Sequence, residues 1–162
     1  MNSGPPRQRT QRPATTQRTL LGFDYGLTRI GVAVGQEITA GTQPLRNVTA
    51  RDGEPDWAII TQLIHTWEPD ALVVGVPLHM DGAEQPITAG ARRFARRLEG
   101  RYRLAVHQVD ERLSSDEAQR RLAARGIRGR GVKEYIDPVA ACLILETWFN
   151  QRGLSDDRAP NS

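Results

Sequence analysis

The sequence predicts an α/β fold in which a mixed central sheet carries helices on both faces, and three observations support this class. Two short apolar segments separated by a turn, at 19–24 and 30–35, are typical of a β-hairpin. A continuous apolar run at 71–76 is typical of a strand that is buried on both faces. Segments with apolar residues at helical spacing lie between and after these strands, as expected for helices that pack on a sheet.

The first part of the predicted sheet is a hairpin. The strand at 19–24 ends in an acid, Asp24, and a turn at Tyr25–Gly26 follows it. The apolar strand at 30–35 should then pair with the first strand. A third strand is expected near Gly41 to Val48.

The central part of the chain alternates helices and strands. Helical spacing of apolar residues predicts a helix over 56–67, which Pro69 closes before the strand at 71–76. A second helix is predicted from Ile87 to Leu98. Its other face carries four basic residues, Arg92, Arg93, Arg96 and Arg97.

The last part should contain one more strand and two helices. Residues 104–109 form the predicted strand, and a capping box from Ser114 to Glu117 predicts a helix that stops at Gly126. A loop rich in glycine and basic residues is expected over 126–135. The final helix is expected over 137–149 and opens on an Asp-Pro pair.

Length and composition predict one ordered domain with a tail at each end. In a chain of 162 residues, we expect a domain over 19–151, a disordered basic tail over 1–18 and a polar tail over 152–162. The chain has neither the run of about 20 apolar residues that a membrane span needs nor the apolar stretch of a secretory signal. The single cysteine, Cys142, lies in an apolar run and agrees with a reducing compartment. We therefore expect a cytoplasmic protein.

The net charge of +3 is unevenly distributed along the chain. Residues 1–19 carry four basic side chains and no acid, and residues 92–133 carry thirteen basic and five acidic side chains. By contrast, residues 20–91 carry three basic and nine acidic side chains. A basic block beside an acidic one indicates a surface for polyanions next to a carboxylate-rich site.

Several acids occupy the ends of predicted elements. Asp24 ends the first strand, Asp110 and Glu111 follow a later strand, and Asp137 begins the final helix. Parallel strands joined by helices place their functional ends at one edge of a sheet, so these carboxylates can converge. Converging carboxylates can hold the divalent cations that hydrolyse phosphodiesters, and their hard oxygen atoms favour Mg²⁺ or Mn²⁺.

Each acid also has a purely structural interpretation. Asp24 could hydrogen-bond its own backbone in the turn that follows. The Asp110–Glu111 pair could lie on the surface, with one member paired to Arg112. Asp137 followed by Pro138 is a near-ideal helix N-cap with proline at the first helical position. The structural interpretation is favoured for each acid alone, whereas their joint placement favours a shared site.

The sequence does not contain the residue patterns that three other kinds of catalytic site require. The three histidines are scattered and have no Cys or His neighbour at the spacing of zinc ligands. The Gly-Lys-Ser/Thr of a phosphate-binding loop does not occur. Ser114 and Ser115 are better explained as helix caps than as nucleophiles.

Four segments together resemble a known family. They are LGFDYGLTRIGVA at 21–33, VVGVPL with MDG across 73–82, VDERLSS at 109–115, and Asp137 with the small and apolar residues that follow it. In this order, over about residues 19–151, they resemble the YqgF family of RuvC-like proteins, which have the RNase H-like fold. The family is described both as nucleases of the 5′ end of pre-16S rRNA and as Holliday junction resolvases.

This resemblance implies a metal-dependent nuclease with three catalytic acids that also bind the metal, carried here by Asp24, Glu111 and Asp137. Asp110 is the alternative to Glu111, because strand alternation lets only one of these neighbours face the site. The hypothesis is that Asp24 bridges two Mg²⁺ or Mn²⁺ ions and that the other two acids complete the cluster. Pro138 departs from the small residue expected after the third acid.

Basic residues are expected to hold the backbone phosphates of the nucleic acid. Such contacts give affinity without sequence preference, and the binding weakens steeply with salt. For the arginine face at 92–97, ordinary solvation is an equally good interpretation. The expected contact residues are Arg29, Arg92, Arg93, Arg96, Arg97, Arg112, Arg128, Arg130 and Lys133.

The resemblance leaves three functions open. The first is a nuclease that processes pre-16S rRNA in ribosome biogenesis, and the second is a Holliday junction resolvase in DNA recombination and repair, which would need a dimer. The third is a nucleic-acid-binding factor without catalysis. An actin-like phosphotransferase shares the Asp-x-Gly opening, but it is built from two such domains and this chain holds one. The sequence distinguishes neither RNA from branched DNA nor a monomer from a homodimer.

Overall fold

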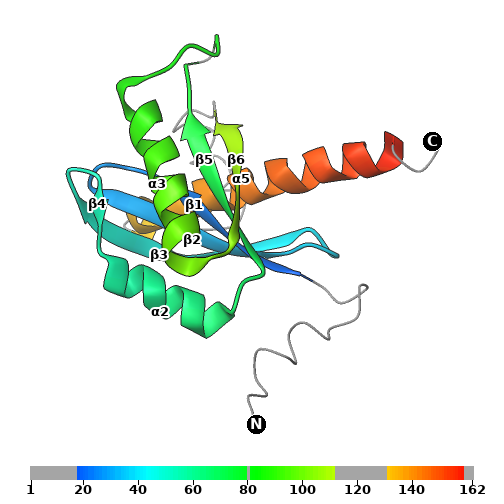
Figure 1. Cartoon of the computed structure of the whole chain (residues 1–162), viewed down its shortest axis with the longest axis horizontal. Helices are drawn as coiled ribbons and strands as arrows, with labels where there is room; N and C mark the ends of the chain where they lie inside the picture. The colour runs from blue at the N-terminus through cyan, green and yellow to red at the C-terminus, as the bar shows by residue number, and fades with distance from the viewer. Residues whose placement is uncertain (1–17, 80, 112–130, 159–162) are drawn as a thin grey trace.

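A mixed six-stranded sheet forms the centre of the molecule (Figure 1), in the strand order β4-β3-β2-β1-β5-β6. The computed structural model describes residues 18–79, 81–111 and 131–158. The strands are β1 (Thr19–Asp24), β2 (Arg29–Gln36), β3 (Gly41–Arg51), β4 (Glu54–Pro55), β5 (Ala71–Pro77) and β6 (Ala105–Glu111). The helices are α2 (Trp57–Trp67), α3 (Pro86–Tyr102) and α5 (Gly131–Arg158).

The antiparallel half of the sheet confirms the predicted hairpin. β1 pairs with β2 along its whole length, from Thr19 opposite Gln36 to Asp24 opposite Gly31. The predicted third strand is also present as β3, which pairs with β2 and runs three residues beyond Val48. The short strand β4, which the sequence did not predict, pairs with the end of β3.

The parallel half of the sheet places the ends of three strands at one edge. β5 pairs in parallel with β1 and with β6, so the three carboxyl ends point the same way. β6 continues to Glu111, two residues past the predicted strand, and Asp110 and Glu111 therefore belong to the sheet. The acids at the ends of β1 and β6 consequently share an edge, as expected.

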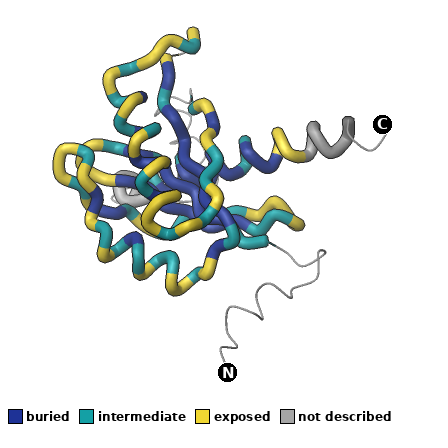
Figure 2. The backbone as a smooth tube through the Cα atoms, viewed as in Figure 1, coloured by how far each residue is buried: buried dark blue, intermediate teal, exposed yellow. Residues whose placement is uncertain are grey.

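Helices cover both faces of the sheet, which confirms the predicted class. α2 and α3 lie on one face over a core that includes Phe23 and Phe94, whose rings meet edge to face at 5.6 Å. α5 crosses the other face over a second core that contains Leu20, Leu145 and the buried thiol of Cys142. The central strands are buried by the two helical layers (Figure 2).

Local capping explains where α2 and α3 begin. Asp56 caps α2 by accepting a hydrogen bond from the backbone of Ala58, so the predicted helix is confirmed. At α3, the hydroxyl of the fully buried Thr88 accepts a hydrogen bond from the Gln85 amide and donates one of 2.6 Å to the Pro77 carbonyl. This pair of bonds ties the first turn of α3 to the end of β5.

The predicted start of the last helix is wrong. α5 begins at Gly131, so Asp137 is not its N-cap, Pro138 lies inside the helix, and residues 131–135 are helical rather than a loop. An internal proline costs about 3 kcal/mol because it lacks an amide hydrogen and crowds the preceding turn. Packing against the sheet offsets such costs, since most helical stability in proteins comes from burying one face. That face contains Val139, Ala141, Cys142, Ile144, Leu145, Trp148 and Phe149.

Other expectations lie partly or wholly outside the described residues. The basic tail up to residue 17, the helix predicted over 114–126 and the first part of the loop at 126–130 belong to this group. α5 continues to Arg158, into the stretch that the sequence assigns to a polar tail. None of the helices within the described ranges is long and apolar enough to cross a membrane.

Candidate active site

Asp24 lies at the end of β1 on the face of the sheet that α5 covers. Side chains alternate along a strand, and Leu20 and Gly22 of β1 both face α5, so Asp24 does too. Its partners on the neighbouring strands are Gly31 of β2 and Gly75 of β5. Because neither partner has a side chain, the space beside the Asp24 carboxylate is open to groups from α5 and β6.

Asp137 reaches this space because α5 approaches the sheet at Gly31. A methyl group on Gly31 would overlap the backbone carbonyl of Asp137 and the nitrogen of Pro138. Since Gly31 is paired with Asp24, this close approach brings the acid of the helix beside the acid of the strand. The two residues are far apart in the chain, and the glycine is the structural feature that lets them become neighbours.

The position of β6 distinguishes Glu111 from Asp110. Val109 packs in the core beneath α5, so Glu111 faces α5 and Asp110 faces the opposite side, where it is exposed. The Cβ atom of Glu111 lies 3.5 Å from the position that a Cβ atom on Gly75 would occupy. Glu111 therefore lies next to the strand position that pairs with Asp24.

The electrostatics of Asp24 reflect these neighbours. Burial raises the pKa of the Asp24 carboxyl well above its ordinary value, and the negative charges of Asp137 and Glu111 raise it further. The charges of two acids from distant parts of the chain thus act on the carboxyl of Asp24. A bound cation would relieve both the repulsion and the loss of hydration.

Arg29 supplies a positive charge at the same place. It is the first residue of β2 and lies on the α5 face, two positions before Gly31. Its guanidinium donates a short hydrogen bond from Nε to Oδ2 of Asp137. The Arg29 side chain is 51% exposed and that of Asp137 is 21% exposed, so the pair lies at the rim of the site.

The donor set fits a hard divalent cation. All three acids offer carboxylate oxygens, the ligands that Mg²⁺ and Mn²⁺ prefer. Among the described residues, no group of three His, Cys, Asp or Glu side chains already stands close enough to hold an ion. The acids are neighbours around one space, and closing them around a cation would require movement of their side chains.

The basic residues that are predicted to contact phosphates are spread more widely over the structure than the three acids. α3 packs on the face opposite α5, so its arginines do not line the carboxylate site. Arg92 pairs with Glu84 at 2.6 Å and Arg97 pairs with Glu54 at 2.7 Å, whereas Arg93 and Arg96 are exposed. The expected contacts Arg112, Arg128 and Arg130 lie outside the described residues, as does the side chain of Lys133.

Sequence reasoning missed two kinds of contributor to the site. Gly31 and Gly75 lie inside apolar strands, and a glycine there is itself a signal of close backbone approach that could have identified them. The pairing of Arg29 with Asp137 spans 108 positions and had no local signal.

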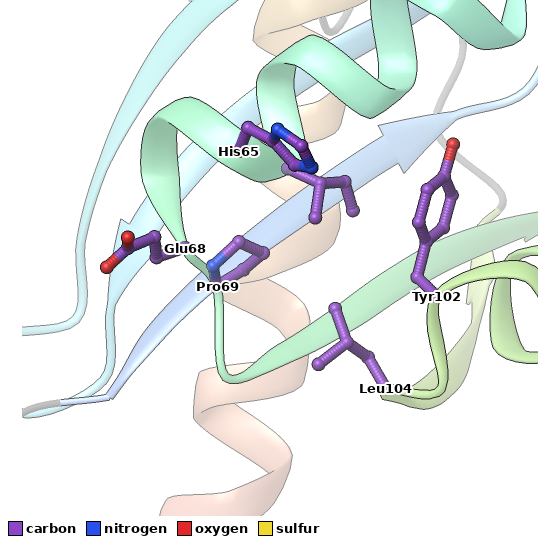
Figure 3. A pocket seen from close by; sticks show the side chains of 6 residues that line it. His65, Glu68, Pro69, Tyr102 and Leu104 are labelled. Carbon is purple, nitrogen blue, oxygen red and sulfur yellow. The ribbon is translucent and has the colours of Figure 1, made fainter. Parts of the chain in front are cut away.

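The pocket shown in Figure 3 is not part of this site. It lies where α2 ends and where β5 and β6 begin, at the edge of the sheet opposite the acids. The hydroxyl of Tyr102 at its wall is hydrogen-bonded to Thr61 at 2.8 Å. The pocket is lined by Ile64, His65, Glu68, Pro69, Tyr102 and Leu104.

Comparison with known proteins shows which family the sequence resembles over most of its length. The family described as "RuvX: Holliday junction resolvase" matches residues 18–151. A protein of Nitrosococcus oceani named "Putative pre-16S rRNA nuclease" is 53% identical over 83% of this chain and 88% of its own length. A protein of Aeromonas hydrophila with the same name is 50% identical over 85% of this chain and 98% of its own length.

A solved structure establishes the fold. RuvC of T. thermophilus, determined in complex with a Holliday junction substrate, superposes with a TM-score of 0.51 over 83% of this chain and 95% of that chain. The sequences are only 17% identical, so this likeness concerns the architecture. The predicted RNase H-like fold is confirmed.

Proposed function

Because the chain belongs to the RuvX family, we propose that it is a nuclease whose phosphodiester-cleaving site is formed by Asp24, Glu111 and Asp137. The observation that supports this most is the arrangement around Asp24. Two glycines flank the acid in the sheet, and the second and third acids come to those two positions. The charges of Asp137 and Glu111 raise the pKa of Asp24, which agrees with one shared site.

We propose that the protein processes the 5′ end of pre-16S rRNA in the cytoplasm and thereby takes part in ribosome biogenesis. The support is the name that these relatives carry, and they are 50–53% identical over most of this chain. The description of the family favours Holliday junction cleavage as the second candidate. That reaction requires two active sites on opposed strands and hence a homodimer, whereas a monomer suffices for the first. The presence of all three acids argues against a binding factor without catalysis.

Asp24, Glu111 and Asp137 would hold Mg²⁺ or Mn²⁺ through their carboxylate oxygens. Such ions supply a more acidic attacking water and stabilise the leaving oxygen. Asp24 comes from a strand held on both sides, which fixes its backbone between β2 and β5. Arg29 offsets the charge of Asp137, and the exposed Arg93 and Arg96 are available to backbone phosphates.

The decisive experiment compares two adjacent substitutions in β6. Glu111→Gln should lower cleavage of a pre-16S rRNA fragment in Mn²⁺ by about 100-fold or more, as for other groups that stabilise transition-state charge. Asp110→Asn should stay within about threefold of the unaltered protein, because Asp110 faces away from Asp24. A synthetic four-way junction is tested in parallel, and chelator should stop all cleavage.

Each variant replaces one carboxylate by its amide at neighbouring positions of β6, on opposite sides of the strand. Equal loss of activity in both, or none in either, would refute the proposed site. Faster cleavage of the junction than of the rRNA fragment would instead favour the resolvase.

A further inference from the structure

The backbone that carries Arg29 is fixed by its surroundings. Arg29 pairs with Thr49 of β3, and the amide of Ala50 donates to the carbonyl of Thr28 at 2.9 Å. The amide of Gly53 donates to the Leu27 carbonyl at 2.9 Å, which anchors the turn between β1 and β2. The guanidinium of Arg29 is thus delivered to Asp137 from a rigid position rather than from a loose loop.

The contact occupies an oxygen that the proposed function needs. Arg29 donates to Oδ2 of Asp137 through Nε, so this oxygen already has a positive partner. A carboxylate oxygen that accepts a charge-assisted hydrogen bond from a guanidinium is a poorer ligand for a cation. Two positive groups close to one carboxylate also repel each other.

We propose that Arg29 and a divalent cation compete for the carboxylate of Asp137, so that Arg29 is a positioning residue that lowers the metal affinity of the site. Arg29 holds Asp137 at the rim through Oδ2, and a cation bound by Asp137 would have to take the place of the guanidinium at this oxygen. This inference rests on the proposed function, because it takes Asp137 as a metal ligand.

The exposure of the pair sets the size of the effect. With the Arg29 side chain 51% exposed, water screens the interaction, and the competition is modest. Replacing Arg29 by glutamine should therefore tighten Mn²⁺ binding by roughly 3- to 10-fold. Lysine keeps the charge and should restore an affinity close to that of the unaltered protein.

Calorimetric titration of the full chain with MnCl₂ alone, without nucleic acid, tests the proposal. Arg92→Gln is the matched control, because it also removes one arginine from an exposed ion pair but on the opposite face of the sheet. That control should bind Mn²⁺ within about twofold of the unaltered protein. Circular dichroism of each variant confirms that it is folded.

The outcomes separate this proposal from the function on which it rests. Tighter binding by Arg29→Gln, with weaker binding by Asp137→Asn, supports it. Unchanged or weaker binding by Arg29→Gln overturns the competition and leaves the site standing if Asp137→Asn still loses affinity. If Asp137→Asn binds Mn²⁺ as the unaltered protein does, or if the unaltered protein binds no Mn²⁺, both the competition and the proposed metal site are wrong.

Discussion

At the scale of single residues, Asp24 illustrates how the proposed catalytic site costs stability. Burial and the charges of Asp137 and Glu111 raise the pKa of this carboxyl, so the folded protein binds its proton more tightly than the unfolded chain does. Above the raised pKa the folded state must keep an unfavourable charge, and stability is lower there. Below the ordinary pKa of 3.8 both states are protonated, and the cost is gone.

Asp24→Asn should therefore stabilise the protein at neutral pH in the presence of chelator. We expect a gain on the order of 1 kcal/mol, seen as a rise of about 3 °C in Tm. The gain should shrink as the pH falls and vanish near pH 3.5. Saturating Mn²⁺ should reduce or reverse the difference, because the cation then stabilises only the protein that binds it.

Thermal denaturation at pH 7.5 and at low pH measures this difference. Asp110→Asn serves as the control, since this residue is exposed on the other side of β6, and its Tm should change by less than about 1 °C. A lower Tm for Asp24→Asn at neutral pH would mean that the carboxylate stabilises the fold, contrary to the origin proposed for its raised pKa.

At the scale of elements, the central strands β1 and β5 were predictable because their burial produces continuous apolar segments. β1 and β5 are buried along nearly their whole lengths and read as continuous apolar runs. The start of α5 was not predictable, because the local signals of Asp137 and Pro138 point to a helix start that packing against the sheet overrides.

The choice between Asp110 and Glu111 was likewise not available from the sequence. It depends on how far β6 continues and on which face Val109 takes, and neighbours in the sheet decide both. The convergence of the acids was predictable in outline, since strand ends share an edge. Gly31 and Gly75, which make room for the acids, could be recognised in the sequence. The residues that approach these glycines, Asp137 and Glu111, could not.

The packing of α5 on the sheet leads to a prediction for Gly31. Gly31→Ala would place a methyl group on the backbone carbonyl of Asp137, so the helix must move away from the strand. We expect a loss of roughly 1–3 kcal/mol in the free energy of unfolding, and loss of cleavage because Asp137 moves with the helix.

Gly100→Ala in α3 is the matched control for this change. A methyl group there meets nothing within 4 Å, and alanine favours the helix over glycine by about 0.5–1 kcal/mol, so this variant should be slightly more stable. Urea denaturation compares the two variants. Equal stability of Gly31→Ala and the unaltered protein would show that α5 tolerates a larger separation from β2.

At the scale of the whole molecule, the acids and many of the basic residues lie on different parts of the surface. The carboxylates lie between the sheet and α5, whereas the arginines of α3 lie on the opposite layer, and two of them are already paired with Glu84 and Glu54. A nucleic acid that binds to these α3 arginines would therefore contact positive charge on the layer opposite the carboxylates. Residues 1–17 carry three arginines and no acid, and they precede β1 at the end of the strand opposite Asp24.

Deleting residues 1–17 should weaken RNA binding without lowering the rate of cleavage at saturating RNA. If each of the three arginines neutralises one phosphate, the slope of log K against log salt should fall by about 2 to 3. Cleavage should persist, because none of the three acids of the proposed site belongs to residues 1–17. Affinity measured across a salt series tests the slope, and the full-length variant Arg7→Gln, Arg9→Gln, Arg12→Gln is the control. An unchanged slope in the deletion would exclude an electrostatic role, and loss of cleavage at saturation would show that the tail takes part in the reaction itself.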